Sequence, residues 1–544
     1  MRNHSALVVT LLLALATATS GAKGTRSAAS GAALSPSTLP AIATTDERFQ
    51  SYNVEMAEVI GGNFWKPYDA ESLARLTAAA KAGPPPPGST PPRPVGQDPS
   101  MFQARPPIDL TDVRLRVLAA ALGPAYMRVS GTWANQVYFH DDNAAPPARP
   151  PAGFQGVLTR AQWKGVVDFA HVVNATLVSS FTISAGVRDA AGVWTADQAA
   201  RLVAYTKSIG GDIAAAEFFN EPNVPSFGGG PRGYNAVAYA KDFAVFRAFA
   251  RSAAPGMRIV GPGSVGEDRL MSAEANSPLA ALMVKTPDML AAEPRPVFDV
   301  FSYHFYGSVS LRCAAMGSAG QTTSEAALSE DWLSRTDHAY DYYVGLRDKS
   351  VPGAPVWITE TADAACGGNP WGATFLDSFR YLDQMGRLAR RGVAAIFHNT
   401  LAASEYGLID QRTLTPRPNY WAALLWHRLM GRTVLDAGAP GEGVHVYAHC
   451  TPGRRGGVTL LAVNTSADGA RSLELPSPAE AFSLTARTLQ AGEVELNGHT
   501  LALTAGGEIP ALPGKRFPAG TVPLAPASLT FFEIADARNP ACAR

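Results

Sequence analysis

Two glutamates in the sequence stand where short apolar runs break, and carboxyl groups placed in this way can do acid–base and nucleophilic chemistry. Glu221 lies in Glu-Phe-Phe-Asn-Glu-Pro-Asn at residues 217–223, and Glu360 lies near the end of Val-Trp-Ile-Thr-Glu-Thr at residues 356–361. Both runs have the length and composition of buried β-strands. Two glutamates at the tips of two strands are the arrangement that hydrolysis of a glycosidic bond needs on a (β/α)8 barrel.

The segments around the glutamates belong to a longer alternation of strand-like and helix-like stretches over residues 46–430. Amphipathic stretches such as 197–208, 236–253 and 374–391 separate the apolar runs. Eight short strands separated by helices favour a parallel barrel over an open doubly wound sheet, and no glycine-rich phosphate loop follows the first strand. The strand-like runs are residues 52–56, 125–130, 176–182, 215–219, 258–261, 300–304, 356–359 and 394–397.

After residue 430 the pattern changes to short segments separated by glycine, proline and asparagine, which predicts a β-sandwich over 431–544. A segment at 23–45 could pair with this sandwich. The proline-rich stretch 83–99 cannot be helical and is expected on the catalytic rim or beside it. With the loop 144–153 it could wall the cleft. The predicted sandwich strands are residues 444–448, 458–463, 472–475, 482–489 and 529–534.

The first residues of the sequence predict export from the cytosol. Met1 and Arg2 give a small positive start, residues 6–16 are apolar, and the small residues through Ala22 suit signal peptidase. The apolar stretch is too short for a good membrane span. We therefore expect a signal peptide over residues 1–22 and a secreted or periplasmic protein.

The four cysteines allow three disulfide connectivities, and their spacing does not decide among them. Cys450 and Cys542 both lie in the C-terminal β-rich region, which makes this pair the first expectation. Cys313 and Cys366 would then pair or stay free. No cysteine lies in a CxxC or His-Cys spacing, so we expect neither a metal nor a cofactor.

The charge balance limits the classes of partner that the protein can attract. Lys plus Arg and Asp plus Glu both number 46 among 544 residues, so no net charge attracts a nucleic acid or an anionic membrane. A chain that is 46% apolar can bury a barrel core and a second domain. We expect neither a nucleic acid nor, beyond export, a membrane as a partner; the expected partner is an oligosaccharide or glycoconjugate substrate.

Ordered motifs give the chain a resemblance to a known family. They are Tyr-Met-Arg-Val-Ser-Gly-Thr at 126–132, Asn-Glu-Pro-Asn at 220–223, Gly-Pro-Gly at 261–263, Tyr-His-Phe-Tyr at 303–306, Trp-Ile-Thr-Glu-Thr at 357–361, Tyr-Gly-Leu-Ile-Asp at 406–410 and Pro-Asn-Tyr-Trp at 418–421. The chain resembles the heparanase-like glycoside hydrolases and β-glucuronidases, glycoside hydrolase family 79 in clan A. The resemblance runs from about residue 50 to the end of the sequence.

The resemblance implies a division of roles in a retaining mechanism. Glu221 would be the general acid/base and Glu360 the nucleophile. Asn220 would bind the sugar 2-hydroxyl, and Tyr306 would donate a hydrogen bond to Glu360. His304 is expected at the same strand end, either in contact with the substrate or as a buried structural histidine.

The resemblance also implies a site for glucuronic acid. Tyr406 and the backbone N–H groups of Gly367 and Gly368 match the positions that hold the sugar carboxylate in that family, although Cys366 replaces an aromatic residue common there. Backbone N–H groups can bind a carboxylate without a net positive charge. Further residues expected to contact sugar hydroxyls are Glu55, Thr132 and Asn135.

The sequence leaves several functions open. Exo action on a terminal glucuronic acid is favoured, because no dense basic cluster lies near the motifs; endo action on heparan sulfate is the alternative. A clan-A retaining hydrolase of neutral sugars would share both glutamates. A non-catalytic carbohydrate-binding protein would need only aromatic platforms such as Trp65, Trp133 and Trp371.

Overall fold

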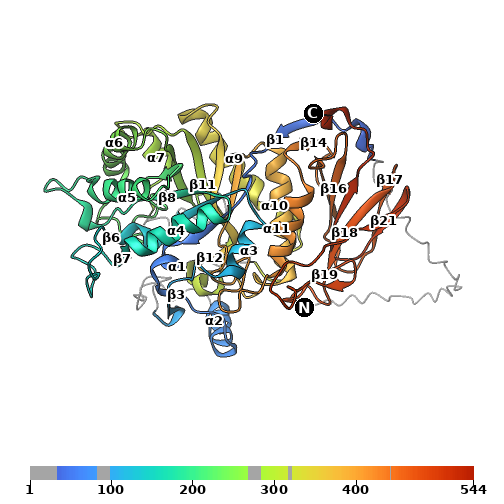
Figure 1. Cartoon of the computed structure of the whole chain (residues 1–544), viewed down its shortest axis with the longest axis horizontal. Helices are drawn as coiled ribbons and strands as arrows, with labels where there is room; N and C mark the ends of the chain where they lie inside the picture. The colour runs from blue at the N-terminus through green and yellow to red at the C-terminus, as the bar shows by residue number, and fades with distance from the viewer. Residues whose placement is uncertain (1–33, 83–98, 268–282, 317–321, 442, 544) are drawn as a thin grey trace, which may run out of the picture.

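The computed structural model of the protein describes residues 34–82, 99–267, 283–316, 322–441 and 443–543. Its centre is a closed barrel of eight parallel strands (Figure 1), so the predicted (β/α)8 barrel is confirmed. The expected signal peptide and the proline-rich residues 83–98 lie outside the described residues. In chain order the barrel strands are β2 (Gln50–Glu55), β5 (Ala125–Ser130), β8 (Ala175–Ser180), β9 (Ala215–Glu217), β10 (Arg258–Val265), β11 (Val300–Val309), β12 (Val356–Ala365) and β13 (Ala395–His398).

The amino-terminal halves of the barrel strands enclose an apolar layer. A cluster of buried side chains takes members from every barrel strand except β2, and Tyr126 and Trp357 are its largest, with ring centroids 4.7 Å apart. Because this layer fills the barrel interior near the strand starts, polar side chains inside the barrel gather toward the carboxyl ends of the strands. These ends carry both glutamates of the sequence motifs.

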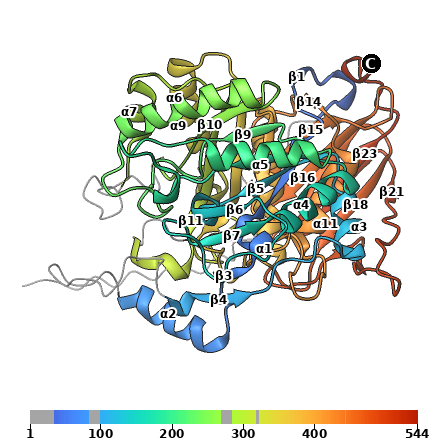
Figure 2. The ribbon, with the colours of Figure 1, turned by 60° about the vertical axis from the view of Figure 1, so that its left-hand side comes forward.

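Helices surround the barrel, and Figure 2 shows α4, α5 and α6 on its outer face. The predicted helices at 197–208 and 236–253 are present as α5 and α6. α4 begins with a capping box between Thr159 and Gln162. The helices of two or more turns are α2 (Ala70–Ala82), α3 (Val113–Ala120), α4 (Arg160–Val172), α5 (Asp197–Ser208), α6 (Ala236–Ala253), α9 (Arg335–Ser350), α10 (Phe375–Arg390) and α11 (Pro418–Leu429).

The region between β2 and β5 contains elements that the sequence did not predict. A short antiparallel hairpin pairs β3 (Gly62–Trp65) with β4 (Phe102–Arg105), and α2 lies between these two strands in the chain. The hairpin brings Trp65 and Phe102 together, with ring centroids 4.7 Å apart in a stacked arrangement. It therefore places an aromatic pair at the barrel rim.

The C-terminal region forms the predicted β-sandwich. Its main sheet runs β1-β14-β15-β16-β23-β18-β19-β20, and a second sheet pairs β17 with β22. Leu473 and Val522 of the second sheet pack with Leu460 and Phe532 of the first in one apolar cluster. The strands are β1 (Ala41–Thr44), β14 (Thr433–Leu435), β15 (Val444–Cys450), β16 (Val458–Asn464), β17 (Arg471–Leu475), β18 (Ala479–Thr485), β19 (Glu495–Leu496), β20 (His499–Thr500), β22 (Gly520–Leu524) and β23 (Ser528–Ile534).

The edge strand β1 comes from the N-terminal part of the chain. It pairs antiparallel with β14, and the ladder sets Thr44 opposite Thr433. The C-terminal sheet therefore contains a strand that precedes the whole barrel in sequence.

Both disulfides are present in the described residues. Cys450–Cys542 joins the end of β15 to the C-terminal turn, as expected, and Cys313–Cys366 joins the segment after β11 to the turn after β12. Disulfides persist mainly in oxidising compartments, which fits a protein outside the cytosol. Among the residues described here, none of the helices has the length and hydropathy to cross a membrane.

Helix α10 lies between the barrel and the main sheet, and a buried carboxylate joins them. Asp383 on α10 accepts hydrogen bonds from His445 and Tyr447 of β15 and from Arg387 of its own helix. Burial alone would raise the pKa of Asp383, but the His445 hydrogen bond and the Arg387 charge hold it below its usual value. The ionised carboxylate therefore stabilises the contact between barrel and sandwich.

Replacing Asp383 by asparagine is expected to lower the free energy of unfolding by about 2–3 kcal/mol at pH 7, because charged hydrogen bonds are lost in a buried site. The native pKa is depressed, so this contribution is complete above the unfolded pKa of about 3.9 and is lost as the pH falls further. Urea unfolding at pH 7 and pH 3 measures it. The difference from wild type should shrink at pH 3, whereas Asp341→Asn in the exposed Arg391 pair should change little at either pH.

Candidate active site

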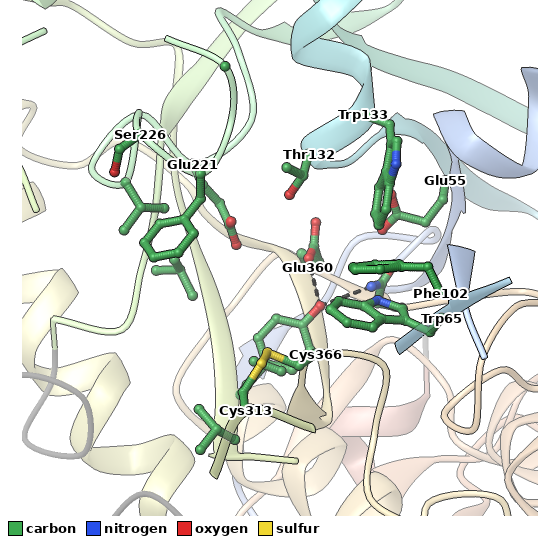
Figure 3. A pocket seen from close by; sticks show the side chains of 18 of the residues that line it. Glu55, Trp65, Phe102, Thr132, Trp133, Glu221, Ser226, Cys313, Glu360 and Cys366 are labelled. Atoms are coloured by element: carbon green, nitrogen blue, oxygen red, sulfur yellow. Dashed lines mark hydrogen bonds between the residues drawn. A yellow bond between two sulfur atoms is a disulfide. The ribbon is translucent and has the colours of Figure 1, made fainter. Parts of the chain in front are cut away.

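A cavity of about 510 Å³ opens at the carboxyl ends of the barrel strands (Figure 3). It contains side chains that the motifs singled out, on segments far apart in sequence. Ligand pockets of proteins have volumes of about 300–1,000 Å³, so this cavity is large enough for a sugar ring with a substituent. The sequence-predicted residues that line it are Glu55, Thr132, Glu221, Tyr306, Glu360 and Tyr406.

Glu360 lies on β12 and is held by two donors. The Tyr306 hydroxyl donates to its Oε1 at 2.6 Å, and Nη1 of Arg128 donates to its Oε2 at 2.9 Å. Both donors are buried. A carboxylate held by two donors in this way is oriented for attack on an atom in the cavity.

Arg128 connects Glu360 to a second buried carboxylate beneath it. Its Nε and Nη2 donate to Oε2 of Glu217 at 3.0 and 2.8 Å. Both side chains are fully buried. Burial alone would raise the pKa of Glu217, but the charge of Arg128 holds it well below its usual range. The sequence did not single out this pair, although a charged residue inside a buried strand always requires a partner.

Glu221 directly follows the β9 segment and reaches the cavity from a sharp turn. Its backbone has φ 51°, in the left-handed region, immediately before Pro222. Burial raises the pKa of Glu221, a shift that the hydrogen bond with His304 reduces and the charge of Glu360 increases. Side-chain oxygens of Glu221 and Glu360 approach within 4.8 Å. The two carboxyls therefore face the same small volume in different environments.

His304, on β11, lies between the two carboxyl groups. Its Nδ1 is 3.1 Å from Oε1 of Glu221 and 3.7 Å from Oε2 of Glu360. Burial alone would lower the pKa of His304, but the Glu360 charge and hydrogen bonds to neighbouring glutamates raise it to about 9. The imidazole ring is therefore positively charged at neutral pH. It contacts the two carboxyl groups but is not among the residues that line the cavity.

Asn399 links two tyrosines of the cavity and was not predicted as a site residue. Its Nδ2 donates to the hydroxyls of Tyr306 at 2.9 Å and Tyr406 at 3.3 Å. The Tyr306 hydroxyl thus accepts from Asn399 while it donates to Glu360. This chain of hydrogen bonds fixes the direction in which the Tyr306 proton points.

Replacing Tyr306 by phenylalanine is expected to lower kcat about 10- to 100-fold, because a hydrogen bond to an ionised carboxylate contributes about 1.5–3 kcal/mol. Steady-state kinetics on a glucuronide substrate measure the change. The matched control is Tyr340→Phe, since the Tyr340 hydroxyl binds only the Arg391 carbonyl on the outer surface. An equal loss in both variants would contradict a role for Tyr306 in the site.

Asn220 and Asn135 bind each other rather than the cavity. Asn135 Nδ2 donates to the Asn220 carbonyl, and its Oδ1 accepts the Asn220 N–H, both at 2.9 Å. The Asn220 side chain accepts from Nη2 of Arg128 at 2.8 Å. Neither asparagine is among the residues that line the cavity. Asn135 thus supports the backbone just before Glu221, which differs from the direct sugar contact expected from the sequence.

Glu55, on β2, lines the cavity. Its Oε2 is buried and has no hydrogen-bond partner among the described residues. Burial and the nearby Glu360 charge raise the pKa of Glu55 well above its usual value. A Cβ at Gly131, whose φ is 93°, would lie 1.6 Å from this oxygen. The glycine of the motif at 126–132 is therefore required for Glu55 to adopt this position.

The Gly367–Gly368 turn lies directly behind the cavity surface. Both glycines have left-handed φ values, and a Cβ at Gly367 would lie 2.6 Å from the Trp65 ring. The Gly368 N–H already donates to the Ala364 carbonyl at 3.2 Å. Among the described residues, the Gly367 N–H has no hydrogen-bond acceptor.

Arg312 binds the carbonyl groups of this turn and was also not predicted from the sequence. Its Nη1 donates to the carbonyls of Cys366, Gly367 and Gly368 at 3.2–3.3 Å. Its Nη2 donates to Glu405 at 2.8 Å. Because the N–H of a trans peptide points away from its C=O, Arg312 turns the N–H groups of both glycines away from itself.

Two expected features lie elsewhere. The loop 144–153 is largely exposed and none of its residues lines the cavity, so the prediction that it walls the cleft is wrong; the β3–β4 hairpin takes that place. Trp371 is buried against Trp332, 5.9 Å away, and offers no platform to a ligand. Trp65 and Trp133 do line the cavity.

Among the described residues, one group of three side chains has the geometry to hold a metal ion, and it consists of Glu221, His304 and Glu360. Arg128 already donates to Glu360 there. A guanidinium charge in that position repels a second cation, so the donor set fits acid–base chemistry better than metal binding.

Several curated proteins are similar to this chain in sequence. The chain is 29% identical to heparanase-like protein 1 of Arabidopsis thaliana, over 66% of the chain and 65% of that protein. It is 27% identical to the heparanase of Mus musculus, over 79% of the chain and 87% of that protein. Over 66–79% of its length the chain resembles the heparanase-like glycoside hydrolases in sequence. Baicalin-beta-D-glucuronidase of Scutellaria baicalensis is 30% identical over 44% of the chain and 46% of that protein.

The chain spans about two thirds of the length of the Arabidopsis protein and under half of the length of the Scutellaria protein. No family model matches the chain. Its fold is similar to that of a 4-O-alpha-L-rhamnosyl-beta-D-glucuronidase from Fusarium oxysporum, with a TM-score of 0.56 over 91% of this chain and 99% of that chain at 14% identity. That similarity concerns the fold.

Proposed function

We propose that this heparanase-like chain is a retaining β-glucuronidase that removes a terminal glucuronic acid by double displacement. The approach of Glu221 and Glu360 to within 4.8 Å carries the proposal. Retaining glycosidases hold their two carboxyls about 5–5.5 Å apart, whereas inverting enzymes need about 6.5–9.5 Å to admit a water.

The environments of the two carboxyls support different roles. Glu221, with its raised pKa, keeps a proton for the glycosidic oxygen. Glu360, held by Tyr306 and Arg128, attacks the anomeric carbon as that bond breaks and forms a covalent glycosyl-enzyme. Glu221 then removes a proton from the water that releases the sugar, so two inversions give net retention.

Recognition of the sugar carboxylate is proposed at Tyr406 and the Gly367 N–H. Tyr406 lines the cavity, and the Gly367 N–H has no partner within the described chain. Glu55, which also lines the cavity, is proposed to accept a hydrogen bond from a sugar hydroxyl. Tyr406 and the Gly367 N–H would donate hydrogen bonds to the sugar carboxylate, and Glu55 would accept one from the sugar ring. This combination fits a uronic acid better than a neutral sugar.

Exo action is proposed from an aromatic wall beside Glu55. Trp133 meets the stacked pair of Trp65 and Phe102 edge-on, with centroids 6.4 and 6.3 Å away. Figure 3 shows these rings on the side of Glu360 away from Glu221. A sugar bound over Glu360 would meet this wall on its far side, which leaves no room there for a further unit of a polysaccharide.

The experiment that tests the function compares an aryl β-glucuronide with the matching aryl β-glucoside. We expect the glucuronide to have the higher kcat/KM by at least about 100-fold, because charged hydrogen bonds to the carboxylate contribute about 1.5–3 kcal/mol each. NMR of the first-formed sugar should show the β-anomer. Preference for the glucoside, or release of the α-anomer, would contradict the proposal, and cleavage of internal heparan sulfate bonds would overturn exo action.

We also propose a secreted or periplasmic location. Two disulfides join described segments 53 and 92 residues apart in sequence. Such bonds are rare in the cytosol. Fractionation of the native cells should find the activity outside the cytosol, and a cytosolic enzyme with reduced cysteines would overturn this assignment.

A further inference from the structure

The cavity wall beside Glu221 is apolar. Val224 and Phe227 follow Glu221 in the chain and line the cavity. Asn223 fixes this segment to β10: its Nδ2 donates to the Val265 carbonyl at 2.7 Å, and its Oδ1 accepts the Val265 N–H at 3.0 Å. We call this surface the leaving-group wall, which consists of Val224, Phe227 and Val265.

No cation of the described chain lines the cavity. Its charged lining residues are all glutamates, namely Glu55, Glu221 and Glu360. The two arginines that approach it from behind are occupied: Arg128 by Glu217 and Glu360, and Arg312 by three carbonyls and Glu405. Besides the aromatic residues, the remaining polar lining side chains are neutral and are Thr132, Gln136, Gln155, Ser226 and Asn399.

The position of Glu221 decides which part of a substrate meets the leaving-group wall. A general acid protonates the glycosidic oxygen, so the group attached to that oxygen starts beside Glu221. A sulfate group there would lose its water and gain no positive partner among the described residues that line the cavity, which is costly. An aromatic ring would instead bury apolar surface against Phe227 and the two valines.

We propose that the site beside Glu221 takes an uncharged aromatic aglycone and discriminates against sulfated sugars. The inference rests on the proposed β-glucuronidase function and adds the class of the leaving group to it. The volume of about 510 Å³ accommodates a sugar ring together with a fused aromatic system. Phe227, which is half-buried, has room to adjust to the ring.

Two matched substrate pairs test the proposal. The first pair is phenyl and 2-naphthyl β-glucuronide, whose leaving phenols are similar in acidity and differ by one apolar ring. We expect about a tenfold higher kcat/KM for the naphthyl compound, from the additional apolar area buried. The second pair is a glucuronyl-N-acetylglucosamine disaccharide with and without a 6-O-sulfate. We expect the sulfate to lower kcat/KM at least tenfold.

Two substitutions at the wall separate its contribution from the chemistry. Phe227→Ala should bring the naphthyl-to-phenyl ratio close to one while phenyl glucuronide is still cleaved. Ser226→Arg adds a cation at an exposed lining position and should reduce the sulfate penalty at least threefold. The control is Val172→Ala, at an exposed valine on the outside of the barrel, which should leave both ratios unchanged.

The outcomes distinguish this inference from the proposed function. If no glucuronide is cleaved, the proposed function fails. If phenyl glucuronide is cleaved but the sulfated disaccharide is cleaved as well as its unsulfated partner, or the naphthyl compound gains nothing, the aromatic aglycone site alone is overturned. If Phe227→Ala does not fold by circular dichroism, the wild-type pairs and Ser226→Arg still decide.

Discussion

Replacing Glu360 by glutamine will lower kcat on every glucuronide by at least about 10⁴-fold and leave the protein folded. Glutamine preserves the size of the side chain, and its amide oxygen can still accept from one of the two donors, Tyr306 or Arg128. An amide cannot form the glycosyl-enzyme ester, and loss of a catalytic nucleophile typically costs several powers of ten in kcat. Steady-state kinetics with a fluorogenic aryl glucuronide have the range to measure it.

The control for this substitution is Glu293→Gln, because the Glu293 side chain is 74% exposed and lies away from the cavity. It should retain wild-type kinetics. Mass spectrometry of the wild type with a 2-fluoro glucuronide should show one covalent adduct, on the peptide that contains Glu360. Activity in Glu360→Gln above a hundredth of the wild-type value would exclude Glu360 as the nucleophile.

Replacing Arg128 by methionine is expected to lower the free energy of unfolding by about 3–5 kcal/mol, because Glu217 would be left charged and unpaired in a buried site. The side chain also donates to Glu360 and Asn220, so activity should fall together with stability. Urea unfolding at pH 7 measures the first effect and kinetics below the unfolding midpoint the second.

The pH dependence of the stability of this variant follows from the direction in which the pKa of Glu217 is shifted. In the wild type the pKa of Glu217 is depressed, so its contribution to stability is complete above its unfolded pKa of about 4.3 and is lost as the pH falls. Without Arg128, burial would raise the pKa of Glu217, and protonation would then stabilise the variant. The loss of stability caused by Arg128→Met should therefore be smaller at pH 5 than at pH 8.

A second substitution separates the two consequences of removing Arg128. In Arg128→Met combined with Glu217→Gln, no buried charge is left unpaired, and most of the lost stability should return. Activity should stay low, because Glu360 still lacks its Arg128 donor. The matched control is Arg251→Met in the exposed pair with Asp299, which should cost little. Full recovery of activity in the double variant would assign Arg128 a purely structural role.

The barrel could be predicted from sequence because its strands are short apolar runs at regular intervals between amphipathic helices. The strand-end glutamates followed from the same pattern, since polar residues that end buried strands gather at one face of a barrel. Arg128 and Glu217 could not be paired in advance. They lie on β5 and β9, which are neighbours of β8 rather than of each other, so their contact depends on barrel closure.

The local structure of the rim was the least predictable part. Cys313 and Cys366 are 53 residues apart, and only the pairing of β11 with β12 brings the segments after them together. The strands β3 and β4 lie on either side of a proline-rich stretch in the sequence. They are only four residues long, and the composition around them gave no strand pattern. The aromatic wall therefore followed from tertiary contacts of Trp65 and Phe102 rather than from any local pattern.

The pairing of β1 with β14 constrains the order in which the protein can be assembled during synthesis. Thr44 leaves the ribosome long before Thr433, its partner across the ladder, has been made. Throughout that interval β1 has unpaired backbone groups along both of its edges, a template for pairing with other chains. The barrel must therefore form while β1, which precedes its first strand in the chain, is still unpaired, and cells that produce this protein in quantity gain from chaperones that cover β1 until translation finishes.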